Sequence, residues 1–226
     1  MKSLLEILSQ TESAKVISND IAYADYVALD LSVTNANLAT QKLATAKDYE
    51  YYIQNYLENH QAKIAFGGYS EHRNLYQRST VFKNDVTEER NIHIGLDLWI
   101  NETAPIYAAL KGKIHSFQNN DALGDYGPTI ILEHEIEGYT FHTLYGHLSL
   151  DSLIGKKAGD IVEKGEQIAT LGLPPINGDY APHLHFQMII GMENKKGDYP
   201  GVCSLKTLPF YLQNCPDPNL LLKIKS

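Results

Sequence analysis

The sequence predicts a mainly β chain, α+β overall, with a compact antiparallel β-sheet core and an N-terminal helical segment. From Ile92 to Ile190, short apolar runs alternate with glycine-containing turns and show little helical periodicity. Before them, residues 36–60 contain no glycine or proline and place apolar residues at helical spacing. A chain of 226 residues can bury one sizeable core, and we expect one principal core here.

Residues 1–62 are predicted to be an N-terminal accessory segment with a long helix. Met1 to Leu8 is typical of a short amphipathic helix, and the apolar alternation over residues 27–33 predicts a strand. In the helix expected over residues 36–60, tyrosines such as Tyr49 and Tyr56 recur on one face. We expect this aromatic stripe to pack on the domain that follows.

Residues 63–89 are predicted to be a connecting segment. Lys63 to Phe66 favours a short strand, and Gly67-Gly68 favours a turn after it. The polar stretch from Tyr69 to Glu89 includes Arg73, Tyr76 and Arg78. Such long connections are uncommon in compact chains, so this one is either functional or a linker, and both alternatives stay open.

Residues 90–226 are predicted to form the main domain with a C-terminal wrap. Short strands are expected at His93–Trp99, Pro105–Ala109, Gly112–Phe117, Thr129–His134, Tyr139–Tyr145, Asp160–Val162, Gln167–Leu171 and His183–Ile190. The tail after Gly191 is rich in glycine, proline and asparagine. We expect it to be ordered but without regular structure.

Composition excludes several classes of function. The net charge is -8 and no basic run is present, so nucleic acid is not an expected partner. No apolar run is long enough for a membrane span, and no signal peptide is visible, so we expect a soluble, cytoplasmic protein unless the sequence is trimmed. The two cysteines, Cys203 and Cys215, are expected to be reduced and partly buried.

The stretch from His93 to Asp97 suggests half of a metal site. In an extended chain His93, Gly95 and Asp97 face the same way, and the glycine leaves room for an ion. We expect Gly95 to lie beneath that ion, so that Gly95→Val lowers zinc affinity. His183 and His185 likewise share one face of a predicted strand, where two neighbouring imidazoles favour a bound ligand.

The other histidines divide into one candidate and several that are set aside. Gly146 permits a turn that presents His147 at a strand end, where catalytic groups often lie. His134-Glu135 lacks the second histidine of the zincin helix motif, since Gly138 stands there. Three histidines are expected to be solvated, and a fourth to face away from His147; these are His60, His72, His115 and His142.

The candidate constellation is therefore His93, Asp97, His147, His183 and His185. A catalytic zinc site uses three protein ligands of nitrogen and oxygen type, which His93, Asp97 and one histidine of the pair would supply. The remaining imidazoles could take a proton from water and stabilise the developing oxyanion during amide hydrolysis.

Three motifs in this order, HxGxD at 93–97, YxHL at 145–148 and PHLHF at 182–186, resemble the lysostaphin/LytM-type zinc metallopeptidases. The resemblance spans about Arg90 to Ile190. It implies a small antiparallel sheet with the metal in an open groove, one Zn²⁺ ion on His93, Asp97 and His185, and His147 and His183 as catalytic histidines. Three tyrosines are expected along the substrate groove; they are Tyr126, Tyr145 and Tyr180.

The resemblance also implies a substrate, which two departures put into question. Family substrates are peptidoglycan cross-link peptides, but the loop from Leu173 to Tyr180 departs from the usual Gly/Thr-rich wall, and Gln187 replaces a common glutamate. The leading hypothesis is a zinc metalloendopeptidase acting on peptide or peptidoglycan-fragment substrates. The alternatives are a cytoplasmic amidase or peptidase for a small substrate, and a non-catalytic binding module. Segments near Gly67–Tyr76 and the C-terminus resemble a subgroup also fused to aminotransferase and kinase modules.

Overall fold

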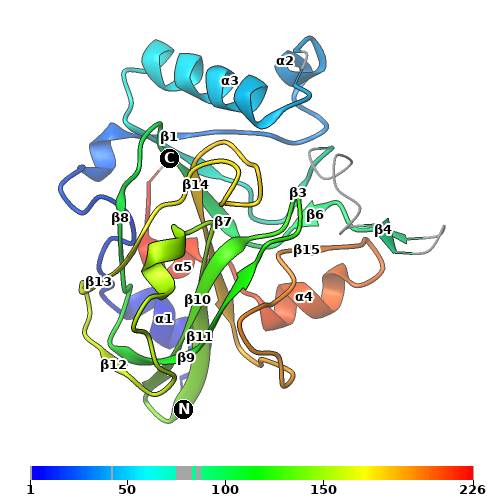
Figure 1. The fold of residues 1–226 in the computed structure, drawn as a ribbon. Coiled ribbons are helices and arrows are strands. Elements are labelled where there is room, and N and C mark those ends of the chain that lie inside the picture. The colour runs from blue at the N-terminus through cyan, green and yellow to red at the C-terminus, as the bar shows by residue number, and fades with distance from the viewer. Residues whose placement is uncertain (1, 42, 75–82, 85–87, 226) are drawn as a thin grey trace.

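The structure, a computed structural model, describes residues 2–41, 43–74, 83–84 and 88–225, and its central feature is an eight-stranded sheet (Figure 1). Tyr76 and Arg78 lie outside the described residues. In spatial order the strands are β1 (Tyr26–Ala28), β2 (Ile64–Gly67), β7 (Leu96–Trp99), β14 (His183–Ile189), β11 (Tyr139–Gly146), β10 (Gly127–Ile136), β9 (Gly112–Asn120) and β12 (Ile161–Val162). Only the β1–β2 pair of this sheet is parallel.

Smaller sheets flank the central one. They are formed by β8 (Pro105–Tyr107) with β13 (Gln167–Thr170), by β15 (Val202–Cys203), β6 (Ile92–His93) and β3 (Glu71–His72), and by β4 (Lys83–Asn84) with β5 (Glu88–Glu89). A strand therefore lies within each run expected in the main domain. The mainly β, antiparallel fold class is confirmed.

The sheet buries both faces, and strand alternation assigns side chains to them. On β14, Leu184, Phe186 and Met188 point into the larger core, which also receives Leu8 and Leu222 from the two ends of the chain. Ile189 points to the opposite face, where a second cluster includes Tyr126, Tyr199 and Cys215. His183 and His185 alternate with the core residues, so they lie on this second face.

The N-terminal segment shares the sheet and core with the rest of the chain. Helix α1 (Leu4–Gln10) begins with a capping box between Ser3 and Glu6. Two further short elements are the 3₁₀ helices η1 (Tyr23–Asp25) and, later in the chain, η3 (Leu150–Leu153). Strand β1 pairs with β2 at the edge of the central sheet, and Leu4 and Leu8 join the larger core, so these parts of the N-terminal segment pack on the sheet. The three-part division of the chain stays a prediction.

The single helix expected over residues 36–60 is two helices, α2 (Ala36–Ala39) and α3 (Ala46–Asn59). The prediction of one continuous helix was wrong, because Thr45 caps the N-terminus of a new helix. The Thr45 side chain accepts from Asp48 N at 3.1 Å, and the Asp48 side chain accepts from Thr45 N at 2.8 Å. The tyrosine stripe packs with Ile53 and Leu57 of α3 against Trp99, as expected.

The tail after Gly191 contains regular structure, which corrects the expectation of an irregular wrap. It forms β15 and two helices, α4 (Leu208–Asn214) and α5 (Asn219–Leu222). Proline is compatible with a helix in its first turn, and α4 carries Pro209 there. Cys203 and Cys215 are both buried and free, as expected. Among the described residues, no helix combines the length and apolar character needed to cross a membrane.

His134 lies on strand β10 and not on a helix, and it makes stability depend on pH. Burial lowers its pKa to about 4, although Nδ1 bonds Lys111 O at 2.9 Å. An unfolded histidine titrates near 6.5, so between these values the unfolded chain binds more protons. We therefore expect protonation of His134 in the unfolded chain to lower the free energy of unfolding by about 3 kcal/mol as the pH falls from 6.5 towards 4.

This effect is measured by urea unfolding of the wild type and His134→Gln across that pH range. Other buried histidines also titrate, so the difference between the two proteins isolates His134. The wild-type advantage should shrink as the pH falls. An advantage independent of pH would contradict the assignment.

Candidate active site

Asp97 and His93 converge although their stretch is not one continuous strand. His93 ends β6 and Asp97 lies in β7, with a bend at Gly95 between them. The expectation of an unbroken extended stretch was therefore wrong. The side chains still meet, with His93 Nε2 3.2 Å from Asp97 Oδ1. In the sheet Asp97 pairs directly with His185, which brings the first and last motifs together.

His93 is oriented by the backbone turn before it. Its Nδ1 lies 2.9 Å from Gly68 O, a carbonyl that can only accept, so Nδ1 carries the proton in the neutral ring. Gly68 has φ of 102°, and a Cβ there would lie 2.0 Å from Arg73 Nη2. Burial lowers the pKa of His93 to about 4. The neutral imidazole therefore presents the Nε2 lone pair to the site.

His185 is oriented by Gln187. The Gln187 amide nitrogen donates to Pro200 O at 3.1 Å and to Cys215 Sγ at 3.2 Å, which turns its oxygen to His185 Nε2 at 2.9 Å. His185 Nε2 then donates to that oxygen, and Nδ1 is the unprotonated nitrogen of the neutral ring. The substitution of glutamate by Gln187, which the sequence left open, thus leaves His185 positioned as a ligand through Nδ1.

Three lone pairs consequently meet at one point. His93 Nε2 lies 2.9 Å from His185 Nδ1, and Asp97 Oδ1 lies 3.2 Å and 3.1 Å from these two nitrogens. A tetrahedral zinc ion with ligands at about 2.0–2.1 Å separates them by roughly 3.3 Å. Without a cation, three facing lone pairs repel. The residues fit a zinc ion in both donor type and spacing.

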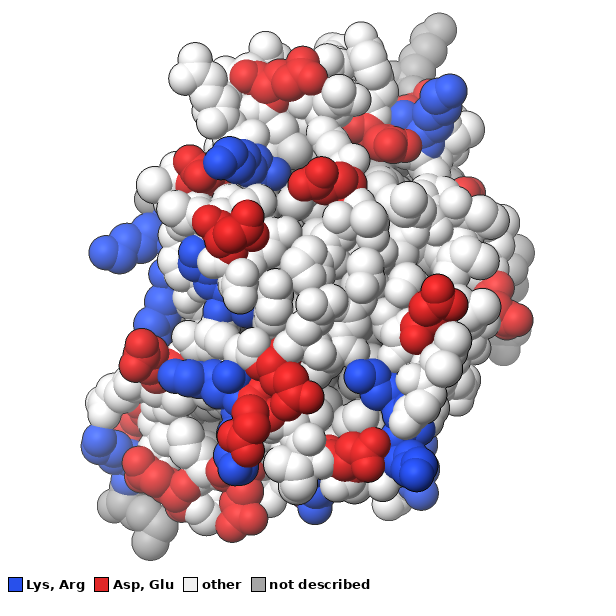
Figure 2. Space-filling view, turned by 60° about the vertical axis from the view of Figure 1, so that its left-hand side comes forward, with Lys and Arg blue, Asp and Glu red and all other residues white. Residues whose placement is uncertain are grey.

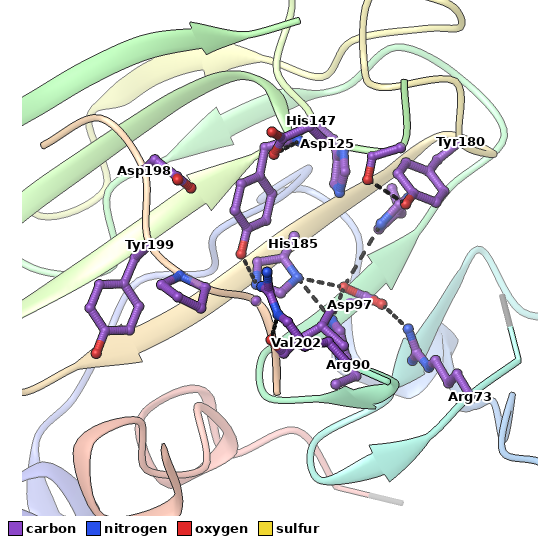
Figure 3. Close-up of a pocket in the computed structure, with 16 residues that line it drawn as sticks. Arg73, Arg90, Asp97, Asp125, His147, Tyr180, His185, Asp198, Tyr199 and Val202 are labelled. Atoms are coloured by element: carbon purple, nitrogen blue, oxygen red, sulfur yellow. Dashed lines mark hydrogen bonds and ion pairs between the residues drawn. The ribbon is translucent and has the colours of Figure 1, made fainter. Parts of the chain in front are cut away.

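Arg73 is a site residue that the sequence did not identify. Its guanidinium is buried and pairs with Asp97 Oδ2 at 2.6 Å (Figure 3). It also pairs with Glu71 and lies 5.5 Å from the centre of the Trp99 ring. Burial raises the pKa of Asp97, but His93 and Arg73 outweigh it and hold that pKa well below its usual range. Arg73 occupies Oδ2 and so leaves Oδ1 to face the metal position. The sequence marked Arg73 only as one arginine in the polar stretch from Tyr69 to Glu89, with no indication that it pairs with Asp97.

His147 and His183 lie beside the three ligands, with ring centres 4.2 Å apart. His147 Nδ1 bonds Asn177 O and His183 Nδ1 bonds Ala181 O, both at 2.8 Å. Each carbonyl fixes a proton on Nδ1, so each neutral ring offers Nε2 as a proton acceptor. His183 Nε2 is 3.8 Å from Asp97 Oδ1. The loop from Leu173 to Tyr180, which departs from the usual family pattern, therefore orients the His147 ring through Asn177 O.

Burial sets the charge state of these two imidazoles. It lowers the pKa of His147 well below its usual value, with further lowering from His183 and His185. Burial also lowers the pKa of His183, partly offset by Asp97. Both rings are therefore neutral near pH 7 and able to accept a proton. His147 itself has φ of 62°, so the left-handed residue at this strand end is the histidine and not Gly146.

A pocket of about 130 Å³ opens over these residues, lined also by Tyr126 and Tyr180. Tyr145 instead packs in the larger core, where it is buried and its hydroxyl accepts from Ala109 N at 2.9 Å. The expectation that Tyr145 lines the groove was wrong, because alternation along β11 turns it away. Among the described lining residues, none precedes Arg73, so the N-terminal segment does not line the pocket.

Charged residues at the pocket include further groups that the sequence did not single out. Arg90, Asp125 and Asp198 line it, with Asp198 and Tyr199 on the side away from Arg73 (Figure 3). On the molecular face shown in Figure 2, acidic and basic side chains are interspersed. Of the histidines set aside, His60 and His72 are exposed as expected, whereas His115 is half-buried against His142.

Gly95 lies beneath the His185 imidazole, which refines the expectation that it lies beneath the ion. A Cβ at Gly95 would lie 2.3 Å from His185 Cε1 and 2.5 Å from Nε2. We expect Gly95→Ala and Gly95→Val to displace His185 and weaken zinc binding roughly 10- to 100-fold. Gly191→Ala is the matched control, since its Cβ would meet only Asn214 at 3.4 Å. Zinc titration tests this, and unchanged affinity in Gly95→Val would contradict the geometry.

Comparison with known proteins identifies similarity over the site-bearing part of the chain. Residues 91–197 match the model of peptidase family M23. The catalytic domain of the antimicrobial peptidase lysostaphin from Staphylococcus simulans is 29% identical, over 54% of this chain and 80% of that chain, with a TM-score of 0.37. The catalytic domain of the prophage-encoded M23 protein EnpA from Enterococcus faecalis is 22% identical, over 53% and 87%, with a TM-score of 0.37. Csd3 from Helicobacter pylori is 24% identical, over 53% and 31%, with a TM-score of 0.33. No curated protein sequence matches the chain.

Proposed function

Residues 91–197 form a peptidase family M23 domain of lysostaphin/LytM type, and on that premise we propose that the protein is a zinc-dependent endopeptidase that cleaves peptidoglycan-type cross-link peptides. His93, Asp97 and His185 are the proposed zinc ligands. His147 and His183 are the proposed catalytic histidines.

One observation carries the proposal: the unprotonated atoms His93 Nε2, His185 Nδ1 and Asp97 Oδ1 lie within 3.2 Å of one another. Each is aimed by a separate contact, from Gly68, Gln187 and Arg73 respectively. Three independent contacts that all turn lone pairs to one point favour a bound cation over a packed polar cluster.

The surrounding residues supply the rest of a hydrolytic site. His93, Asp97 and His185 would hold a zinc ion, which would supply Lewis-acid activation of the scissile carbonyl and the attacking water. His147 and His183, both neutral with Nε2 free of a proton, can take the proton of the water and pass it to the leaving amine. Arg73 keeps Asp97 ionised and fixes its orientation without entering the reaction.

The pocket supports a substrate with small side chains at the scissile bond. Its volume of about 130 Å³ is below the roughly 300–1,000 Å³ usual for sites of drug-sized ligands. Cross-link peptides built from glycine or alanine meet this limit. A bulkier side chain next to the scissile amide would lie against Tyr126 or Tyr180, which line the pocket.

The proposal is tested by hydrolysis of a peptidoglycan digest and of defined Gly-Gly and D-amino-acid cross-link peptides. Turnover should stop after zinc is removed with a chelator and return when Zn²⁺ is added. Turnover that is unchanged without metal would contradict zinc dependence. A parallel panel of small metabolite amides tests the substrate, and cleavage of those amides alone would exclude the cell-wall assignment while keeping the zinc site.

A further inference from the structure

A second group of metal-ligand side chains lies on the central sheet, away from the pocket. His115 of β9, Glu133 of β10 and His142 of β11 each offer one ligand atom, and these atoms all lie within 4.8 Å of one another. The three strands are neighbours in the sheet (Figure 1). We propose that these residues bind a second divalent transition-metal ion, such as Zn²⁺.

The donor set selects the class of ion. Two imidazoles and one carboxylate are ligands that zinc uses in known three-residue sites. Hard cations such as Mg²⁺ and Ca²⁺ prefer sites made mostly of oxygen ligands, whereas imidazole favours Zn²⁺, Ni²⁺ and Cu²⁺. The cluster is therefore a transition-metal site.

Strand register brings the three side chains to the same face. Glu133 and His142 are direct partners across β10 and β11, with Glu133 Oε2 3.8 Å from His142 Nε2. On β9, Ser116 pairs with Ile131 and Ile114 with Leu132, which leaves His115 as the extra residue of a β-bulge. Such bulges redirect side chains. The His115 ring meets the His142 ring edge to face at 4.9 Å between centres.

The charge states also suit a metal. Burial lowers the pKa of His115. Burial, and next to it the neighbouring His115, lower the pKa of His142, so both rings are neutral near pH 7. Lys113 lowers the pKa of Glu133, which is therefore ionised. Lys113 Nζ bonds Oε1 at 2.8 Å and leaves Oε2 towards His142. His142 Nδ1 is buried and, among the described residues, has no hydrogen-bond partner.

The second site is independent of the first. His142 pairs with Ile189 and Gly146 with His185, so the two sites are four residues apart along β11, about 13 Å. None of its three residues lines the pocket. Its ligand atoms are more widely spaced than those of the first site. The positive charges of Lys113 and Lys196 near His115 also disfavour a cation there. The second ion therefore binds more weakly, and it links β9, β10 and β11.

Zinc titration of the metal-free full-length chain against a chromophoric chelator tests the proposal. The wild type should bind two equivalents, the second more weakly. His115→Gln and Glu133→Gln should each lose only the weaker equivalent and keep wild-type peptide hydrolysis. His60→Gln, at an exposed histidine of the helical segment, is the matched control and should bind two equivalents.

A second equivalent that persists in both His115→Gln and Glu133→Gln would overturn the proposal. So would a single equivalent in the wild type that both variants retain. If the wild type binds one equivalent that both variants lose, the second site stands and the first site fails, so the two proposals are tested separately.

Discussion

Asp97→Asn is expected to abolish zinc binding and peptide hydrolysis. The amide oxygen carries no charge, so the ligand set loses the carboxylate that anchors the cation. The same change removes the carboxylate that pairs with the buried Arg73 at 2.6 Å. Breaking a buried ion pair by removing one partner typically destabilises a protein by about 3–5 kcal/mol, and Glu71 compensates part of this here.

Binding and folding must be separated in that experiment. Zinc content and hydrolysis are measured on protein shown by circular dichroism to be folded at the assay temperature. His93→Gln removes another ligand without unpairing Arg73, so it should lose zinc with a smaller loss of stability. Asp151→Asn, at an exposed carboxylate of η3, is the matched control. A folded Asp97→Asn protein with wild-type zinc affinity would contradict the ligand assignment.

His147→Ala and His183→Ala are each expected to lower hydrolysis by about 100- to 10,000-fold while zinc stays bound. This range is typical for removal of a general acid or base. The reason is geometric: both Nδ1 atoms are held by backbone carbonyls at 2.8 Å, and both Nε2 atoms remain to exchange protons in the pocket. Steady-state kinetics and zinc titration on the same preparations measure the two effects.

The control for this pair is His72→Ala, which removes an exposed histidine of β3 and should leave both activity and zinc unchanged. Loss of zinc in His147→Ala or His183→Ala would place that histidine among the ligands instead. Wild-type turnover in both variants would exclude proton transfer by these histidines.

The sequence predicted the strands that carry the site residues well because alternation is a local signal. Asp97, His183 and His185 each lie on the strand expected for them, and β7, β14 and β11 are consecutive in the sheet. The match of residues 91–197 to the model of peptidase family M23 supports the family prediction. Residue types and spacing were sufficient here because the ligands lie on regular strands.

Long-range and cap interactions could not be predicted in the same way. Arg73 meets Asp97 across 24 positions of sequence, and no periodicity marks it. Helices α2 and α3 separate because Thr45 and Asp48 form a cap within a stretch free of glycine and proline. His115 was expected to be solvated because the sequence offers it no partner at ligand spacing. In the structure a β-bulge, which has no reliable sequence signal, turns its ring towards His142.

The ligand assignment is tested most directly by anomalous diffraction at the zinc edge from crystals of the zinc-loaded protein. The account predicts that the strongest peak lies at about 2.0–2.2 Å from His93 Nε2, Asp97 Oδ1 and His185 Nδ1, with Arg73 on Asp97 Oδ2. A zinc ion bound through His185 Nε2, or no ion on these three residues, would contradict it.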